Sequence, residues 1–302
     1  MATIIDLHMH STCSDGVLTP TQMIDKAVAN KVKYLSIADH DTIMAYTPEF
    51  FEYAKSKGIT LIPAVEMSTK FEGIGVHLLG YNFDITNSEL LSTLDSLINS
   101  RQNYLLDVAK KLNELGYTLN VTELQKVPSV TKANIAMDIT SNKANERLLL
   151  QNFGHIPSKG EFIETIMNKG CPAYVEKYNI SPVDASRIIH KAGGKVVIAH
   201  PVAYRFEDDM KVSWVQHLVD EVKPDGIEAN YLYINRYDEL IDEVGFWRAF
   251  AEKNNLFTTI GSDYHNSDSL HPEIGFSNYE FTLTDKETEA IYTNLTKKKK
   301  SK

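Results

Sequence analysis

Histidines and carboxylates recur at the ends of short apolar runs throughout this chain of 302 residues. Thr3-Ile-Ile-Asp-Leu leads into His8 and His10, and Val196-Val-Ile-Ala leads into His200. Short apolar runs rich in β-branched residues are typical of buried strands, and α/β barrels carry their chemistry at the carboxyl ends of strands. Nine side chains of metal-binding type follow this pattern: His8, His10, Asp15, His40, Glu66, His77, His200, Asp263 and His265. Their recurrence predicts one shared site that binds metal.

Composition and charge narrow the class of protein. The hydrophobic content of 43% and the charged content of 24% are those of an ordinary globular protein, and the length suits one large α/β domain or two smaller ones. A net charge of −9 offers no general attraction for nucleic acid or anionic membranes. No run approaches the ~18 apolar residues of a membrane span, and the start of the chain lacks a leader pattern. We therefore expect a cytoplasmic protein with no membrane contact, and no protein partner is indicated.

The order of apolar patterns predicts an α/β fold. Residues 3–83 read as strand, helix, strand, helix, strand and strand, which is typical of parallel β/α units. Thr19 is a predicted N-cap with Pro20 in the first turn, and Gly58 is a predicted helix end after Lys57. Strand patterns resume at 195–200, 225–230 and 257–261, which brings the total to about seven.

The middle of the chain has a different character. Leu90 begins a long helical pattern that continues to Gly116. Further helical patterns cover 131–139, 143–153, 158–169 and 181–192. We therefore expect a barrel made of residues 1–100 and 175–302, with residues 101–174 inserted as a small helical subdomain that caps the barrel rim.

The residue types also restrict the metal. His8 and His10 alternate on one strand end, so both imidazoles can reach one ion. Imidazole combined with carboxylate suits Mn²⁺, Fe²⁺ and Zn²⁺, and the carboxylate share favours Mn²⁺. The ligands exceed what one ion needs, which predicts two or three ions able to clamp phosphoryl oxygens. Any one of these histidines could be an ordinary core residue, but burying the whole set without partners would be costly. The remaining histidines lie away from strand ends and are expected not to bind metal: His155, His190, His217 and His271.

These ordered residues resemble the polymerase-and-histidinol-phosphatase (PHP) superfamily of metal-dependent phosphoesterases. The resemblance is carried by His8-Met-His10, Ser14-Asp15-Gly16, Ala38-Asp-His40-Asp41, Glu66, His77, Ala199-His200-Pro201 and Gly261-Ser-Asp263-Tyr-His265. The Ala-His-Pro segment, Gly226-Ile-Glu228 and the helical insertion resemble the branch of nucleoside-bisphosphate and nucleoside-monophosphate phosphatases and 5′–3′ exoribonucleases.

The resemblance implies a distorted (β/α)7 PHP barrel with three divalent ions. It assigns His8, His10, Glu66 and Asp263 to the first ion, Glu66, His77 and His200 to the second, and Asp15, His40 and His265 to the third. It also implies a hydrolase that cleaves a phosphomonoester, either a nucleoside monophosphate or a nucleoside 3′,5′-bisphosphate, through a hydroxide that bridges the ions. No catalytic group beyond the metal ligands is expected.

Three alternatives stay open. A 5′–3′ exonuclease or phosphodiesterase acting on short RNA would use the same ions along an open basic track. A histidinol-phosphate phosphatase would share the barrel, although the insertion suits it poorly. A non-catalytic metal-binding module is disfavoured by the complete ligand set, since such modules can lose ligands without losing their fold.

The expected substrate contacts depart from the family pattern. Members of this branch commonly carry Arg-Pro-His in the insertion, where this chain has Lys132-Ala-Asn134. Lys132 keeps the positive charge but lacks the two-pronged geometry with which arginine binds phosphate. Asn134 cannot act as a cation, and Arg205 corresponds to the arginine after Ala-His-Pro, displaced by one position. We expect Lys132, Asn134 and Arg205 to contact a small phosphorylated substrate, of nucleotide or short-RNA type.

Overall fold

The strands join side by side into one distorted ring. The computed structural model describes residues 5–204, 206, 210–231, 233–235, 239–267, 272–275 and 283–297. Parallel strands β1 (Ile5–Asp6), β2 (Tyr34–Leu35) and β3 (Thr60–Leu61) form one sheet. The second sheet contains, in spatial order, β10 (Phe257–Ile260), β7 (Gly226–Asn230), β6 (Lys195–Ile198), β5 (Ile74–Tyr81) and β4 (Ala64–Phe71).

Two contacts close the ring. A parallel bridge between His40 and Glu66 joins the segment after β2 to β4. At the other side the Leu7 amide donates to the Ile260 carbonyl at 3.2 Å. A separate hairpin of β8 (Tyr233–Ile234) and β9 (Leu240–Ile241) lies outside this ring. The prediction of a distorted α/β barrel is therefore confirmed.

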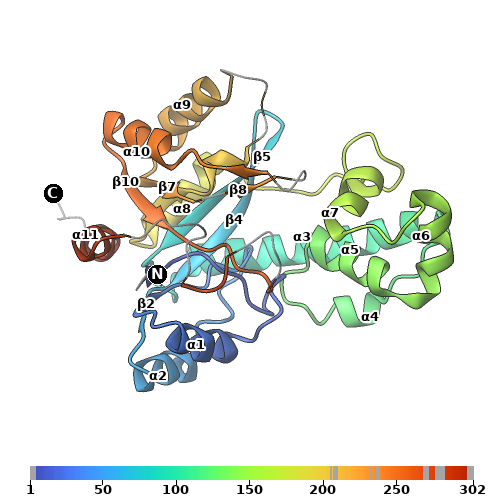
Figure 1. Ribbon diagram of the computed structural model, residues 1–302, viewed down its shortest axis with the longest axis horizontal. Helices are drawn as coiled ribbons and strands as arrows, with labels where there is room; N and C mark the ends of the chain where they lie inside the picture. Colours follow the sequence, from blue (N-terminus) through green and yellow to red (C-terminus); the bar gives the residue numbers. More distant parts are fainter. Residues whose placement is uncertain are drawn as a thin grey trace.

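Helices cover the outside of the ring (Figure 1). They are α1 (Pro20–Ala29), α2 (Pro48–Ser56), α8 (Pro182–Lys191), α9 (Met210–Val222), α10 (Val244–Lys253) and α11 (Asp285–Thr296). Thr19 caps α1 in a capping box, as predicted, and Gly58 adopts a left-handed φ of 76° after α2. The sequence patterns did not anticipate α9, α10 or α11. Among the described residues no helix combines the length and the apolar character that crossing a membrane requires.

β5 runs opposite to its neighbours. It is antiparallel to both β4 and β6, so the parallel arrangement predicted for the β/α units does not extend to β5. Only Glu72 and Gly73 separate β4 from β5, and a connection this short can join only antiparallel strands. Glu66 and His77 lie within β4 and β5, and not at the strand ends where the sequence patterns placed them.

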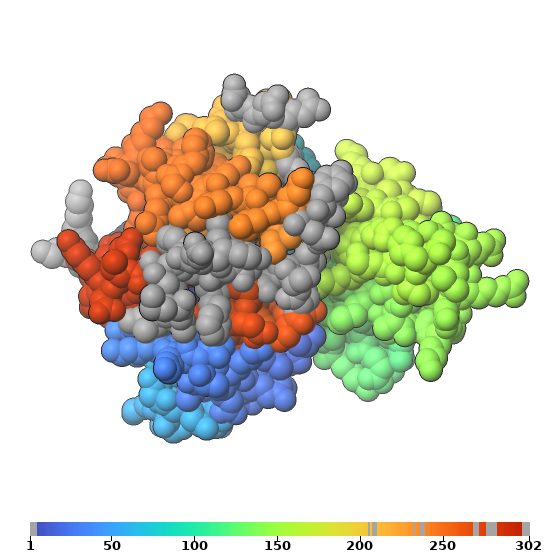
Figure 2. Space-filling model, in the orientation of Figure 1, coloured from blue at the N-terminus to red at the C-terminus, as the bar shows by residue number. Residues whose placement is uncertain are grey.

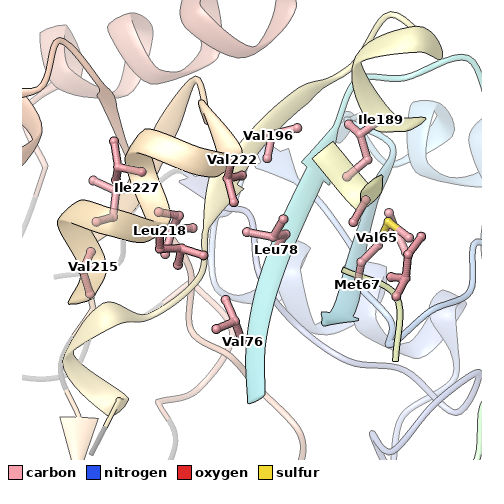
Figure 3. Close-up of a cluster of buried hydrophobic side chains, with 14 of the residues drawn as sticks. Val65, Met67, Val76, Leu78, Ile189, Val196, Val215, Leu218, Val222 and Ile227 are labelled. Atoms are coloured by element: carbon pink, nitrogen blue, oxygen red, sulfur yellow. The ribbon is translucent and has the colours of Figure 1, made fainter. Parts of the chain in front are cut away.

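Successive side chains along these strands point alternately toward the surrounding helices, where they form a hydrophobic core, and into the interior of the ring. Figure 3 shows Val76 and Leu78 of β5 packed with residues of the surrounding helices, such as Leu218 of α9. Leu79, two residues after His77, packs in the interior with residues of β1 and β6. Successive side chains point to opposite faces, so the odd-numbered residues of β5 face the interior, and His77 is one of them.

A second lobe projects from the barrel (Figures 1 and 2). It contains the distal part of α3 (Ser88–Glu114), then α4 (Val121–Leu124), α5 (Lys132–Ser141), α6 (Glu146–Phe153), α7 (Lys159–Phe162) and a π-helical turn, Ile163–Met167. Residues between Tyr104 and Ala173 give this lobe a hydrophobic core of its own. The separate core supports our assignment of residues 101–174 as a cap subdomain, which stays a prediction.

Candidate metal centre

The nine candidate ligands enter the interior of the ring from six separate chain segments. His8 and His10 follow β1, His40 follows β2, and His200 follows β6. His200 and Asp263 have positive φ values of 26° and 51°, conformations that non-glycine residues rarely adopt. The Asp263 amide donates to the His8 carbonyl at 2.7 Å, which fixes one of these segments against another. Unusual backbone geometry of this kind tends to occur where function requires it.

Glu66 lies at the centre of the group. Its Oε1 is 2.8 Å from Nδ1 of His77 and 3.2 Å from Nε2 of His200. Its Oε2 is 2.9 Å from Nδ1 of His40 and 3.3 Å from Nε2 of His10. Oε1 also lies 3.4 Å from Nε2 of His8. The two carboxylate oxygens therefore face three and two imidazoles, an arrangement that suits a carboxylate bridging two ions.

Asp263 and Asp15 occupy the two flanks. Asp263 Oδ1 is 3.2 Å from Nε2 of His10 and 3.5 Å from Nε2 of His8. Asp15 Oδ1 is 3.4 Å from Nε2 of His265, and its Oδ2 is 3.7 Å from Nε2 of His40. Two donors that each lie ~2.0–2.2 Å from one ion are about 3 to 3.5 Å apart, so most of these spacings suit shared ions.

When the ligand atoms are grouped by their mutual distances, the groups overlap and differ from the expected division of the ligands among three ions. Three sets have mutually close donor atoms: His10, Asp15, His40 and His265; His8, His10 and Glu66; and His40, Glu66 and His77. The assignment of His40 to one ion only, and of His10 to another, therefore stays a prediction. All nine side chains do converge on one interior.

Several buried atoms in the centre fit a bound cation. Asp15 Oδ1 and Glu66 Oε2 have no hydrogen-bond partner among the described residues, and neither has His40 Nδ1. His40 Nδ1 and Glu66 Oε2 face each other at 2.9 Å without the geometry of a hydrogen bond. Since buried polar atoms are normally paired, their orientation and chemistry suit metal coordination.

The charges of the centre are strongly coupled. Burial alone would raise the pKa of Glu66, but His77, His40 and His8 hold it well below its ordinary value. Burial would lower the pKa of His10, but the adjacent carboxylates of Asp263 and Glu66 raise it to about 10. Burial lowers the pKa of His40 to about 4. The nearby histidines also hold the pKa of Asp15 well below its ordinary value. Glu66 and Asp15 are thus ionised and require nearby positive charge, which divalent cations can supply.

A second layer of side chains orients the ligands. Glu228, which is buried, accepts from His8 Nδ1 at 3.1 Å and from the His200 amide at 3.0 Å. Tyr231 donates its hydroxyl to Asp263 Oδ2 at 3.0 Å. Hydrogen bonds of this kind fix the ring orientation and basicity of metal ligands. Glu228 belongs to the Gly226-Ile-Glu228 motif, which by itself predicted no role for this residue.

A buried ion pair links the centre to the second lobe. Asp41, next to His40, accepts from Arg101 of α3 through Nε at 2.8 Å and Nη2 at 2.5 Å. The same guanidinium donates to the Val130 carbonyl at 3.0 Å and to Ser68 Oγ at 2.8 Å. Arg101 was overlooked, although a signal existed: it falls on the apolar stripe that runs from Leu90 to Leu112 along the helix.

The expected substrate contacts have different environments. Lys132 donates to Asn168 Oδ1 at 3.1 Å, at the inner side of the second lobe. Asn134 is occupied as a helix cap, because its Oδ1 accepts from the Thr131 amide at 2.7 Å and its Nδ2 donates to the Ser14 carbonyl at 3.2 Å. The bond to Ser14 holds the second lobe against the segment that carries Asp15. Arg205 lies outside the described residues.

Lys177 is a further cation that the sequence did not reveal. Burial, together with Arg101 and Lys132, lowers the pKa of Lys177 to about 7, against the attraction of Asp41 and Asp15. Lys177 follows the lobe in a segment without helix or strand, where no periodicity marks it as functional.

Comparison with known proteins identifies the family. The PHP domain model matches residues 6–170. A 5′–3′ exoribonuclease of Haemophilus influenzae is 32% identical over 264 residues, covering 86% of this chain and 89% of that protein. A 3′,5′-nucleoside bisphosphate phosphatase of Chromobacterium violaceum is 26% identical over 265 residues, covering 86% of this chain and 87% of that protein.

The fold has a solved counterpart. An amidohydrolase structure from Chromobacterium violaceum, at 24% sequence identity, aligns with a TM-score of 0.75 and covers 92% of each chain. The chain belongs to the PHP domain family. It is a metal-dependent phosphoesterase, and the clustered histidines and carboxylates are able to bind the metal.

Proposed function

We propose that this enzyme hydrolyses a phosphomonoester of nucleotide type, a nucleoside monophosphate or a nucleoside 3′,5′-bisphosphate. The observation that carries the proposal is the convergence of nine donors on one interior, with Glu66 facing five imidazoles from its two oxygens. The similarity to a nucleoside bisphosphate phosphatase supports the choice of substrate.

In this proposal the metal ligands are His8, His10, Asp15, His40, Glu66, His77, His200, Asp263 and His265. They would hold three divalent ions, Mn²⁺ by preference. Bound there, the ions would neutralise phosphoryl oxygens, stabilise the departing oxygen and acidify an attacking water.

The chain supplies positive charge of its own beside the centre. The positive charge of Lys132 repels that of Lys177, and the carboxylate of Asp15 attracts it. An anionic phosphate placed between the lysines and the ligand group would relieve the repulsion between the two amines. We assign both lysines to substrate binding, whereas Asn134 would act indirectly by holding the cap in place.

A second candidate function has its own support. The relative with 32% identity is a 5′–3′ exoribonuclease, and that identity exceeds the 26% shared with the phosphatase. The same metal centre could cleave a phosphodiester at the end of a short RNA. Direct measurement must separate these two activities.

The test is a screen of the purified protein with Mn²⁺. Substrates are AMP, adenosine 3′,5′-bisphosphate, a bis-aryl phosphodiester and a short 5′-phosphorylated RNA. Release of phosphate from the first two compounds alone supports the phosphatase, whereas stepwise shortening of the RNA supports the exoribonuclease. Inactivity toward all four contradicts both.

A ligand variant tests the metal centre itself. Asp263→Ala should reduce bound metal and turnover together, because Asp263 faces both His8 and His10. Asp95→Ala, at an exposed position on α3, is the matched control and should change neither. Full activity in an Asp263→Ala protein that has lost metal would contradict the proposed site.

A further inference from the structure

Ser11, Ser14 and Asp39 form a buried hydrogen-bond network beside the metal centre. The amide of Ser11 donates to Asp39 Oδ1 at 2.7 Å, and the hydroxyl of Ser11 donates to Asp39 Oδ2 at 2.6 Å. The Ser14 hydroxyl donates to Asp39 Oδ1 at 2.6 Å. None of the three residues is more than 1% exposed, so the protein itself satisfies these polar groups. The proposed function gives this network no role.

The network reaches the metal centre through His10. Ser14 Oγ lies 3.4 Å from Nδ1 of His10, whose imidazole is fully buried. The other ring nitrogen, Nε2, lies 3.2 Å from Asp263 Oδ1 and 3.3 Å from Glu66 Oε2. His10 therefore has one nitrogen in contact with Ser14 and the other nitrogen among the candidate metal ligands.

The direction of these hydrogen bonds follows from the protons available. A backbone amide can only donate, so Asp39 Oδ1 accepts from Ser11. The Ser14 hydroxyl has a single proton, which it donates to the same carboxylate oxygen. Ser14 Oγ therefore presents a lone pair to His10, and the proton of that contact must be carried by Nδ1 of His10.

A proton on Nδ1 leaves Nε2 of His10 free to bind a cation. A neutral imidazole has one donor nitrogen and one acceptor nitrogen, and the partner of the donor decides which nitrogen is free. Nε2 of His10 lies 3.3 Å from Nε2 of His8. Nδ1 of His8 also faces an acceptor, Glu228, at 3.1 Å. The two Nε2 lone pairs thus point to the same space, where a cation would bind both.

Asp15 is a weaker partner for the same proton. Its Oδ1 is 3.6 Å from Nδ1 of His10, beyond hydrogen-bond distance, and 3.4 Å from Nε2 of His265. In the proposed function Asp15 is itself a metal ligand, so its oxygens are directed to an ion. Ser14 therefore provides the hydrogen bond that holds the proton of His10 in place.

We propose that Ser14 and Asp39 are positioning residues for His10. Asp39 directs the Ser14 hydroxyl, and Ser14 holds His10 with its proton on Nδ1 and its Nε2 toward the ions. The inference rests on the proposed function, because it takes His10 to be a metal ligand. It adds two residues that contact neither metal nor substrate and yet determine which nitrogen of His10 is available.

Calorimetry with Mn²⁺ on chelator-treated protein tests this role without turnover. Ser14→Ala should weaken Mn²⁺ binding about 10- to 100-fold, the usual effect of removing a group that orients a metal ligand. Ser36→Ala is the matched control and should leave the affinity unchanged. Ser36 is also fully buried, and its hydroxyl has no hydrogen-bond partner within the described part of the chain. Circular dichroism checks that both variants are folded.

A third variant separates the hydrogen bond from the charge of Asp39. In Asp39→Asn the amide oxygen can take the position of Oδ1, where it still accepts from the Ser11 amide and from the Ser14 hydroxyl. Asp39→Asn should therefore weaken Mn²⁺ binding less than Ser14→Ala does. A larger loss in Asp39→Asn than in Ser14→Ala would mean that Asp39 acts through its charge, and would overturn the proposal.

Nitrogen-15 NMR detects the assigned proton directly. In histidine-labelled protein loaded with Zn²⁺, a diamagnetic substitute, the protonated and the metal-bound nitrogens have different shifts, and signals lost in His10→Gln identify those of His10. We expect a proton on Nδ1 in the wild type and faster exchange of that proton with water in Ser14→Ala. Binding of Zn²⁺ through Nδ1 of His10 would overturn the proposal, and the wild-type spectrum decides this even if a variant fails to fold.

The calorimetric outcomes separate this proposal from the proposed function. Reduced Mn²⁺ affinity in His10→Gln combined with unchanged affinity in Ser14→Ala overturns the role of Ser14 and Asp39 alone. Unchanged affinity in His10→Gln overturns both, because His10 is then no ligand. The proposed substrate class fails on another result, which is the absence of nucleotide hydrolysis by the wild-type enzyme.

Discussion

Replacing Arg101 with methionine should destabilise the protein by about 3–5 kcal/mol, the cost of leaving one member of a buried ion pair without its partner. Arg101 is 3% exposed and Asp41 is 1% exposed, so water cannot replace the lost contacts. The guanidinium makes four hydrogen bonds, two of them to Asp41. Methionine fills similar volume, so the loss should reflect the unpaired charge and not a cavity.

A double-mutant cycle tests the cause. In Asp41→Asn, the amide oxygen can still accept from the Ser68 amide, which donates to Asp41 at 2.7 Å. The double variant Arg101→Met/Asp41→Asn should be at least about 1.5 kcal/mol more stable than the sum of the single changes predicts, because it leaves no buried charge. Urea unfolding, followed by circular dichroism on chelator-treated protein, measures this without a contribution from bound ions.

The control is an exposed pair. Arg187 is 46% exposed and contacts Glu89 at 2.6 Å, so Arg187→Met should cost no more than about 0.5 kcal/mol. A loss below about 1 kcal/mol for Arg101→Met, or strict additivity in the cycle, would refute the view that this ion pair stabilises the junction.

Three further predictions concern other parts of the molecule. Glu228→Gln should lower metal affinity about 10- to 100-fold while the fold is retained, because Glu228 orients His8. Metal titration measures the affinity, and circular dichroism checks that the variant is folded. Unchanged metal affinity would contradict this role of Glu228. Lys177, with a pKa of about 7, should react with amine-acylating reagents at neutral pH at least tenfold faster than typical surface lysines, and bound inorganic phosphate should slow the reaction. Peptide mass spectrometry measures both rates. A rate equal to that of surface lysines would contradict the assignment of Lys177 to phosphate binding. Asp225 accepts a hydrogen bond from His190 at 2.7 Å, and this bond and its other partners lower the pKa of Asp225, although burial would raise it. The ionised carboxylate should therefore stabilise the fold fully at pH values well above the unfolded pKa of 3.8, and this stabilisation should decline as the pH falls below that value. Asp225→Asn should cost about 1–3 kcal/mol at pH 7 and progressively less in acid, whereas equal losses at pH 7 and pH 3 would contradict this.

Most of the candidate metal ligands were predictable because two independent patterns coincide at them. An apolar run marks a strand, and a histidine or carboxylate at its end marks the rim of a barrel. His8 and His200 satisfy both criteria, and the structure brings them to one interior. The direction of β5 was not predictable from periodicity, because an apolar alternation reads the same in either direction. His77 was found by its residue type and not by its place at a strand end.

Contacts between distant segments account for most of what the sequence did not reveal. Arg101 and Asp41 are 60 positions apart, and nothing local to either residue indicates a partner. Lys177 lies in a segment without periodicity, and its chemistry arises from cations and carboxylates that only the fold assembles around it. Asn134 illustrates the opposite case, since its position three residues after Thr131 is a capping box that could have been read as structural.

Helix α3 has a consequence for how substrates enter. Its first turns pack Leu90, Leu94 and Leu97 into the barrel core, and its later turns pack Leu105 and Leu112 into the core of the second lobe. At 27 residues it is an uninterrupted rod of about 40 Å, without a glycine or proline at which it could flex. The two lobes therefore have no hinge at this crossing, and the cap should behave as a fixed wall instead of a swinging lid. The separation between the two lobes is then set by the length of this helix.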